Sequence, residues 1–473
     1  MKKRAISRLT ALILALTLLC TLCILCPGCE QSGPAPERSA APEPESSAQP
    51  AEPGPAGEPD TLQVLIDVEF SSPFVTPLAE GMGNRLVDNL KLSGGKIGEV
   101  EFAYLPKEGA DREAALTRMR TEIMSGQGPD LFICGCTNPQ AEEEPLFRFP
   151  AQAMENQLFL PLDEYFASAQ FTEYEKLLPM AMEAGRNQEG QQLVPLAFTL
   201  PVTVFRKEEV QHQHSQTMTW AQQLEGDAAM QLSAVPNPSN CLYRSMPFLA
   251  LADYETESLC FTQEELGSCL ETLHRLPYEQ EKLEVPEHFT TGLCVNFINL
   301  PDANVTYYDS SHHGSLRADD VFTMVPAYSS QGGYGAYTTS FAAINRNTDK
   351  PEEAFLLLDY LLSLDGARSE LYGRLLDKVG MPVHMDLGGM GGAVAMVAGG
   401  AWWMSDENYQ EYCSLRDNIA AMRFSTPLER HITQALWDID SIEWKRSQGE
   451  KTDSEEKIIA NAYRTMKMEL GES

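Results

Sequence analysis

The order of apolar segments between residues 62 and 135 most constrains the fold of this chain. "LQVLIDVEF" predicts a strand that ends at Phe70, "VEFAYL" a second strand, and "PDLFICG" a third, buried strand. A helical segment through Leu86 to Leu92 and the amphipathic stretch "DREAALTRMRTEIMSG" separate these strands. This βαβαβ order predicts an α/β fold in which helices cover both faces of a parallel sheet.

The length of the chain and one helix start refine this prediction. Residues 61–473 exceed one typical core and fit two lobes of about 150 to 200 residues each. Pro351, followed by Glu352 and Glu353, predicts a helix start. The backbone N–H that proline lacks has no acceptor within the first turn of a helix, and the helix dipole favours carboxylates there. The apolar run 354–362 then predicts a largely buried helix.

The N-terminal stretch "LCTLCILCPGC" repeats cysteine at every third position, close to the spacing of an iron–sulfur site. Residues 9–26 are nevertheless almost entirely apolar, and basic residues precede them. Basic residues, an apolar run and a small-residue step are the three parts of a secretory signal. Residues 1–28 are therefore interpreted as a signal peptide, in which the thiols act as small apolar side chains.

This signal resembles that of bacterial lipoproteins, which ends at a cysteine linked to diacylglycerol. The resemblance implies that Cys29 is the lipidated new N-terminus, with palmitate among its acyl chains. It also implies a location on the extracytoplasmic face of the bacterial cell membrane. The alternative is an uncleaved signal anchor, because the apolar run of about 18 residues is barely long enough to span a bilayer.

Composition predicts a tether and limits the partners. Residues 29–60 are rich in Pro, Ala and Glu and predict an extended, disordered tether. A formal net charge of −33 argues against a nucleic-acid partner and predicts repulsion from anionic headgroups, so membrane contact should run through Cys29 alone. The cysteines beyond Cys29 are odd in number, which leaves at least one thiol free within a single chain.

A series of motifs in fixed order resembles the extracellular solute-binding proteins of the maltose-binding type (family 1), the receptor components of ABC importers. In chain order the motifs are "RTEIMSGQGPDLFICG", "FLPLDEYF", "GQQLVPLAFTLPVTVFRKEEV", "TMTWAQQL", "HFTTGLCVNFIN", "DVFTMVPAYSSQGGYGAYTTSFAAINRNTDKPEEAFLLLDYLLS" and "SQGEKTDSEEKIIANAYRTM". The resemblance spans residues 62 to 467. Residues 386–418 match poorly and look like an insertion or a diverged loop.

The resemblance implies a two-lobed, type II periplasmic-binding-protein-like fold. The expected N-terminal lobe comprises 61–197 and 328–383, and the C-terminal lobe comprises 198–327 and 384–473. Crossover strands near 193–206 and 321–327 would form the hinge for closure. The implied function is capture of a small solute, an oligosaccharide by the family's habits, by a monomer that delivers it to ABC permease subunits.

Ligands of open parallel sheets bind outside the carboxyl ends of the strands, where loops converge. Hydroxyl and amide groups suit the polar atoms of a sugar, a glycine permits close backbone approach, and aromatic faces stack on sugar C–H groups. For each candidate the alternative is an ordinary turn or core packing. The candidates are Ser71, Ser72, Gly135, Cys136, Thr137, Asn296, Asn299, Tyr334, Tyr337, Trp402, Trp403, Arg423 and Phe424.

Catalytic motifs find little support in the sequence. His212 and His214 lie outside an H-E-x-x-H frame, as does the pair "HH" at 312–313, and polar surface loops account for them. There is no G-x-S-x-G elbow and no Walker motif, so we expect no catalytic residue, metal or cofactor, and an ATPase on a separate chain. A same-fold sensor for a membrane signalling partner and a secreted glycan-active hydrolase remain the alternatives.

The anchor hypothesis predicts the outcome of one substitution. Cys29→Ala removes the only proposed attachment atom, so the protein should leave the membrane fraction or accumulate as an unprocessed precursor. Membrane fractionation and the mass of the N-terminal peptide measure this. Mature protein that stays bound to membranes without Cys29 would show the hypothesis to be wrong.

Overall fold

The computed structural model describes residues that all belong to the unit Gly57–Ser473. They are 61–68, 81–137, 143–200, 202–234, 248–280, 283, 291–294, 321–369, 381–388, 393–397, 400–403 and 406–472. The expected signal peptide and tether, with Cys29, lie outside these ranges, as do Ser71, Ser72, Asn296 and Asn299. Within the ranges, no helix combines the length and apolar character that a membrane span requires.

The predicted βαβαβ unit is confirmed. Strands β1 (Leu62–Asp67), β2 (Val100–Tyr104) and β3 (Leu131–Gly135) are parallel, with β1 between the other two. Helices α2 (Met82–Leu92) and α3 (Gly109–Met124) connect them. Every residue of β3 is buried, as its continuous apolar run predicts for a strand that is covered on both faces.

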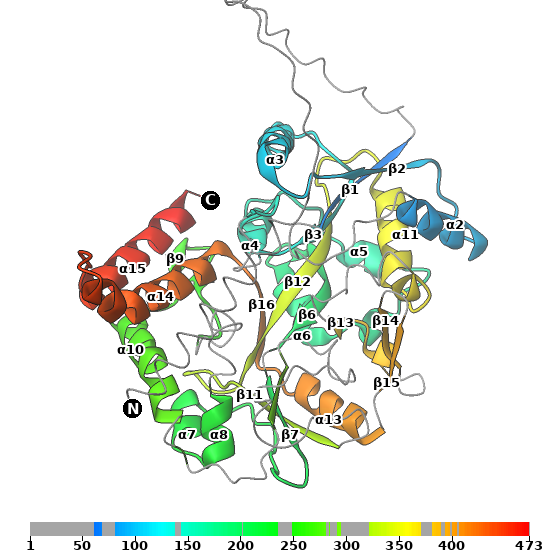
Figure 1. Cartoon of the computed structure of the whole chain (residues 1–473). Coiled ribbons are helices and arrows are strands. Elements are labelled where there is room, and N and C mark those ends of the chain that lie inside the picture. The colour runs from blue at the N-terminus through cyan, green and yellow to red at the C-terminus, as the bar shows by residue number, and fades with distance from the viewer. Residues whose placement is uncertain are drawn as a thin grey trace, which may run out of the picture. The chain divides into compact units, whose positions relative to one another are not determined.

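Four further strands complete this first sheet. They are β6 (Leu193–Thr199), β12 (Gly335–Ile344), β13 (Met381–Pro382) and β16 (Ala421–Phe424). The order is β13-β6-β12-β3-β1-β2, and β16 also pairs with β12. β12 is antiparallel to β3 and β6 and parallel to β16, so the sheet is mixed. Figure 1 shows β12 running through the middle of the molecule.

A second sheet contains β10 (Thr291–Cys294), β7 (Val202–Arg206) and β11 (Phe322–Pro326), with both outer strands antiparallel to β7. The chain enters this sheet directly from β6 and leaves it from β11 to β12. Both expected crossover segments are therefore strands that lead from one sheet to the other.

The lobe boundaries expected from the sequence stay a prediction. β16 lies in the stretch expected for the C-terminal lobe, yet its backbone pairs with β12 of the first sheet. The diverged segment 386–418 contains an antiparallel hairpin of β14 (Ala393–Val397) and β15 (Gly400–Trp403), followed by α13 (Asp406–Asp417).

The remaining elements are short or helical. The helices are α4 (Pro150–Glu155), α5 (Asp163–Phe166), α6 (Pro179–Ala184), α7 (Trp220–Leu224), α8 (Ala228–Ser233), α10 (Gln263–Gln280), α11 (Pro351–Leu362), α14 (Pro427–Ser447) and α15 (Glu455–Gly471), with 3₁₀ turns at Tyr174–Lys176, Gly366–Arg368 and Met385–Gly388. The two-residue strands β4 (Arg186–Asn187) and β5 (Gly190–Gln191) form one hairpin, and β8 (Ala252–Asp253) and β9 (Ser258–Leu259) form another.

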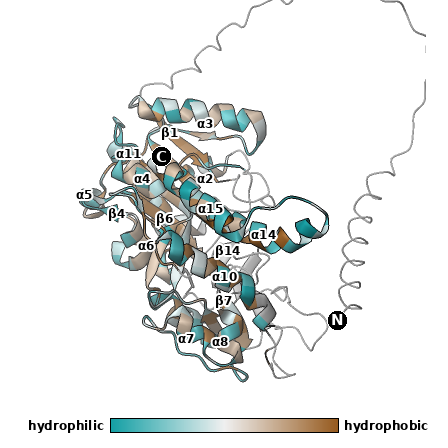
Figure 2. Ribbon diagram, turned by 90° about the vertical axis from the view of Figure 1, so that its left-hand side faces the viewer, coloured by the Kyte–Doolittle hydropathy of each residue, from teal (hydrophilic) through white to brown (hydrophobic). Residues whose placement is uncertain are grey.

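Helices cover both faces of the first sheet, as predicted. Side chains of α2 and α11 join the core on one face, and side chains of α3 and α4 join the core on the other. A separate core forms where α10, α14 and α15 pack together. In Figure 2 the strands are mostly coloured as hydrophobic, whereas α3 and α15 carry hydrophilic residues along their length. The burial of apolar side chains between these layers is the main driving force for the fold.

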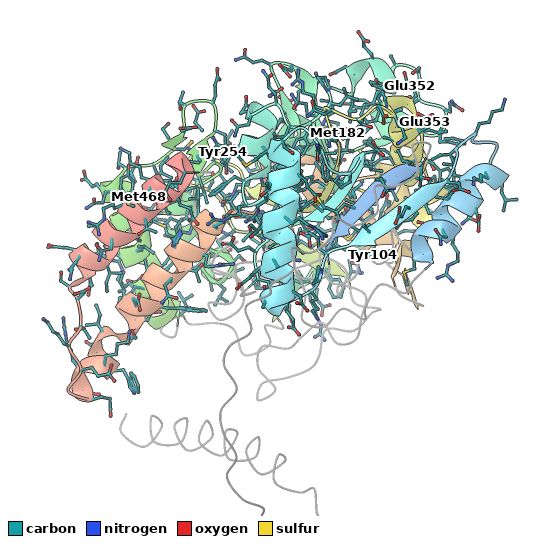
Figure 3. The ribbon with its side chains drawn as sticks, turned by 90° about the horizontal axis from the view of Figure 1, so that it is seen from above. Tyr104, Met182, Tyr254, Glu352, Glu353 and Met468 are labelled. Carbon is teal, nitrogen blue, oxygen red and sulfur yellow. The ribbon has the colours of Figure 1, made fainter. Side chains whose placement is uncertain are left out.

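Two helix starts follow local chemistry that is readable from the sequence. α11 begins at Pro351, and Glu352 and Glu353 are exposed in its first turn, as predicted (Figure 3). The Thr-Trp motif starts α7 with a capping box, in which the Thr219 hydroxyl accepts from the backbone N–H of Gln222. Such caps satisfy helix N–H groups that have no partner within the helix.

A buried ion pair joins the end of β1 to α3. The Arg112 guanidinium donates to both carboxylate oxygens of Asp67, at 2.8 and 3.2 Å, and both residues are almost fully buried. Arg112 also donates to the carbonyl oxygens of Pro106 and Glu144, and Asp67 accepts from the Leu146 N–H at 2.9 Å. Both charges are fully hydrogen-bonded. The pair thereby joins the end of β1 to the segment after β2, which contains Pro106, and to the segment after β3, which contains Glu144 and Leu146.

Removing one member of this pair should be strongly destabilising. Arg112→Met leaves the Asp67 carboxylate buried without its counter-charge, so the free energy of unfolding should fall by about 3–5 kcal/mol. Urea unfolding followed by tryptophan fluorescence measures this. The control Arg118→Met breaks an exposed pair on the same helix, whose members are 68% and 40% exposed, and should cost at most about 0.5 kcal/mol. Equal effects of the two substitutions would contradict this role for Arg112.

Candidate functional site

The structure brings three of the sequence-predicted segments together on β12. Gly135, at the end of β3, pairs with Ser340, and the Cys136 N–H donates to the Thr339 carbonyl at 2.9 Å. Farther along the same edge of β12, opposite the edge that pairs with β6, Tyr337 pairs with Arg423 and Thr338 with Phe424 of β16. Gly135 to Thr137, Tyr337 and Arg423–Phe424 therefore converge where β3 ends, which is the position that the sheet topology predicts for a ligand.

A row of buried hydroxyl groups lines this position. Thr137, Thr338, Thr339 and Ser340 are 3%, 0%, 9% and 2% exposed. Their hydroxyl oxygens have no hydrogen-bond partner in the described part of the chain. An unsatisfied buried polar group costs about 1–3 kcal/mol, so four of them in one place indicate a site that a polar molecule completes.

The backbone is irregular at the same place. Pairing between β12 and β6 shifts register between Thr338 and Ser340 and again between Ser340 and Phe341. Bulges of this kind turn side chains away from the regular ladder and occur often beside functional sites. The sequence reasoning selected Tyr337 but passed over Thr338 to Ser340, although three successive hydroxyl residues directly follow the glycine-rich loop.

Arg423 is held in place at the edge of this site. Its guanidinium donates to the Phe248 carbonyl at 2.9 Å, lies 4.9 Å from the centroid of the Tyr337 ring and is 3.6 Å from the Glu429 carboxylate. Burial raises the pKa of Glu429, and Arg423 and the Thr426 cap oppose this rise. The charge of Arg423 is therefore matched within the protein, and its guanidinium positions Tyr337 and α14.

Two small cavities adjoin Arg423. One of about 150 Å³ is lined by residues of α4, α6, β16 and the segment 250–254, including Tyr254 and Thr426. The other, of about 10 Å³, lies beside Tyr337 and Ser329. Figure 3 labels Tyr254. Both are smaller than the roughly 300–1,000 Å³ of a typical ligand pocket, so neither of these two cavities holds a large ligand by itself.

The two thiols near the site are unreactive. Cys134 and Cys136 are free and buried, and burial raises the pKa of both well above the ordinary value of a thiol. Cys136 lies in the loop just beyond β3, where its thiol contacts the Ser425 backbone and its N–H is bonded to β12. Since the thiolate is the nucleophilic form, neither residue suits covalent or redox chemistry at neutral pH.

The other candidates occupy different places. Tyr334 is fully buried, and its hydroxyl donates to the Leu415 carbonyl at 2.6 Å. Phe424 packs edge-on against Phe341, with ring centroids 5.5 Å apart. Trp402 and Trp403 lie in β15, and their side chains are outside the described part of the structure, as are Ser71, Ser72, Asn296 and Asn299.

The interpretation of His214 as a surface-loop residue is wrong. Its side chain is 2% exposed and lies 3.3 Å from the Glu411 carboxylate. His212 Nε2 lies 2.8 Å from the Tyr328 hydroxyl, and burial, with a smaller contribution from His214, lowers the pKa of His212 to about 4. No group of three or more metal-ligating side chains occurs among the residues that the structure describes, and the "HH" pair at 312–313 lies outside them.

Comparison with known proteins supports the fold that the motifs predict. No family model matches the sequence, and no curated protein matches it. A periplasmic oligogalacturonide binding protein from Yersinia enterocolitica has a TM-score of 0.54 at 11% identity, covering 87% of this chain and 99% of that one. An extracellular solute-binding protein family 1 from Alicyclobacillus acidocaldarius has a TM-score of 0.51 at 13% identity, covering 87% and 98%.

A de novo designed cysteine esterase, ECH19, has a TM-score of 0.50 at 12% identity, covering 87% of this chain and 98% of that one. At these identities the likeness concerns the fold. The chain therefore has the α/β fold of extracellular solute-binding proteins, and the prediction of that fold is confirmed. The designed esterase shows that the same fold can carry different chemistry, so function has to be argued from the site.

The unpartnered hydroxyls predict an unusual effect on stability. Thr338→Val keeps the shape of the side chain and removes a buried polar group that has no partner, so the free energy of unfolding without ligand should rise by about 1 kcal/mol. In the matched control Thr433→Val, the lost hydroxyl donates to the Glu429 carbonyl at 2.8 Å, and stability should fall by about 1 kcal/mol. Urea unfolding measures both, and destabilisation by Thr338→Val would contradict the assignment.

Proposed function

We propose that this protein is an extracytoplasmic solute-binding protein that captures a carbohydrate and delivers it to an ABC permease, without making or breaking a bond. The observation that carries the proposal is the row of buried, unpartnered hydroxyls at the carboxyl end of β3. It lies in a fold shared with solute-binding proteins. Hydroxyls serve as both donors and acceptors, and so do the hydroxyl groups of a sugar.

The charges around the site support an uncharged sugar. Arg423 and Glu429 face each other at 3.6 Å and neutralise each other, and Thr137 and Thr338 to Ser340 carry no charge. A cationic ligand such as a polyamine would require carboxylates that face the ligand, and an anionic one would require an unmatched guanidinium or ammonium group. The Yersinia protein is named for an oligogalacturonide, a saccharide that carries carboxylates, so its name supports the saccharide class and not the absence of charge.

Capture would depend on closure of two lobes, 61–197 with 328–383 and 198–327 with 384–473. The passage from β6 to β7, through residues 200–201, and the passage from β11 to β12, through residues 327–334, are suited to act as hinges, because short segments can absorb the change in backbone angles. A ligand that contacts both lobes favours the closed state by its differential affinity. A permease can then distinguish loaded from empty receptor.

The proposed location is the outer face of the cell membrane, with a lipid on Cys29 as the sole membrane contact. A tether of residues 29–60 would hold the body away from the bilayer. The strongly negative charge supports solubility and makes nucleic acid an unsuitable partner. The working form would be a monomer that meets permease subunits only when it is loaded.

Ligand-induced stabilisation tests the binding function. The full-length chain should unfold at a higher temperature with a matching oligosaccharide but not with amino acids or polyamines, since a ligand at 100 times its dissociation constant adds about 2.7 kcal/mol. Thr338→Val should lose most of this shift, whereas Thr433→Val should keep it. A shift with polyamines alone would contradict the sugar assignment, and release of shortened products from the saccharide would contradict a non-enzymatic function.

A further inference from the structure

A groove of about 710 Å³ runs between α2 and β2, at the far end of the first sheet. It is far larger than the cavities beside Arg423. Figure 1 places β2 and α2 on the opposite side of the molecule from α14 and α15, and Tyr104, labelled in Figure 3, ends β2. Its lining comes from α2, from β2, from the residues directly before each of them and from Thr61.

β2 presents unused backbone groups to this groove. The strand pairs with β1 on one side and is the last strand of the sheet in the described residues. The Glu99 carbonyl accepts from Leu62 at 2.9 Å, and the Leu105 N–H donates to Ile66 at 3.2 Å. Because successive residues of a parallel strand face opposite sides, the backbone groups of Val100 and Phe102 point away from β1. Such an edge can pair with another strand.

The floor of the groove is apolar and rigid. Val87 is 6% exposed, and Val100 and Phe102 are half-buried. At Gly83 of α2, an added Cβ would lie 2.6 Å from the Phe102 ring, so the helix packs directly on the strand and holds Phe102 in place. A partner strand would therefore meet a preformed surface in which apolar side chains can pack.

The rim of the groove is acidic. Asp88, Glu99 and Glu101 line it, and Lys91 is the only cation among the lining residues. The carboxylates of Asp88 and Glu99 form no ion pair with any residue that the structure describes. Edge pairing of β2 with a second copy of this chain would bring like charges together, which disfavours it. A basic partner complements the rim.

We propose that this groove, here named the β2 groove, docks an extended, basic segment of a partner protein as an added strand on β2. Lysine or arginine side chains on one face of that segment would face Glu99, and alternate apolar side chains on its other face would pack on Phe102. Asp88 of α2 would add negative charge at the rim. Main-chain hydrogen bonds to Val100 and Phe102 supply affinity, and the charges supply selectivity. Because the groove is remote from β12, docking and solute binding can occur together.

Fluorescence anisotropy with defined peptides tests this docking. The probe is a labelled short peptide of alternating Lys and Val, added to the full-length chain at physiological ionic strength. It should bind, whereas the matching Glu–Val peptide and the Lys–Val peptide with alternate amides N-methylated should not. The double substitution Asp88→Lys with Glu99→Lys should weaken binding at least about tenfold through loss of charge complementarity.

Matched variants separate docking from general attraction to an acidic protein. Glu443→Lys with Glu450→Lys changes the net charge equally on exposed residues of α14 and the turn after it, and should change affinity less than about twofold. Val100→Pro removes an outward-facing N–H that an edge strand can lose without unfolding, and should weaken binding. Any one of four results would overturn the proposal. They are an equal loss of affinity in both double variants, unaltered binding to Val100→Pro, self-association through β2, and no binding of the Lys–Val peptide.

Discussion

Hydrogen bonding of β12 to three neighbouring strands is the constraint on which the rest of the structure depends. β12 pairs with β3, β6 and β16, and its buried residues contribute to the cores on both faces of the sheet. The other two segments of the candidate site, which are the end of β3 and β16, are held in fixed register by hydrogen bonds to β12. A slip of one residue would turn Thr338 and Ser340 to the opposite face, so the apolar pattern of β12 also holds the polar site in place.

Buried polar groups in this protein differ in how completely their hydrogen bonds are satisfied. Some buried charges are fully partnered: Arg112 and Asp67 bond each other, and the Asp359 carboxylate accepts backbone N–H bonds from Gln170 to Thr172 at 2.7 to 3.1 Å. The hydroxyls at the end of β3 have no partner among the described residues. Since unmet buried polar groups are costly, four neighbouring hydroxyls without partners make the end of β3 the candidate position for a polar molecule.

Much of the architecture could be predicted from local patterns. Apolar periodicity located β1, β2 and β3, the Pro351 and Thr219 motifs located helix starts, and both crossovers lie where the motifs placed them. The site was predicted less well, because exposure and partners depend on what the rest of the chain places beside a residue. Tyr334 and Cys136 have side chains suited to a ligand but are covered by neighbouring elements, and His214 is buried against Glu411.

The sequence by itself determined the alternation of strands and helices, the acidic character and the segments that could reach a ligand. These properties depend on neighbours along the chain and on composition. Only the tertiary structure decided that Thr137 and Thr338 to Ser340 lie buried in neighbouring positions without partners among the described residues, and that β2 is the last described strand of its sheet, beside an acidic groove. The hydroxyl positions arise from pairing between β3 and β12, about 200 positions apart, and the place of β2 from the order of strands across the sheet, neither of which local sequence patterns encode.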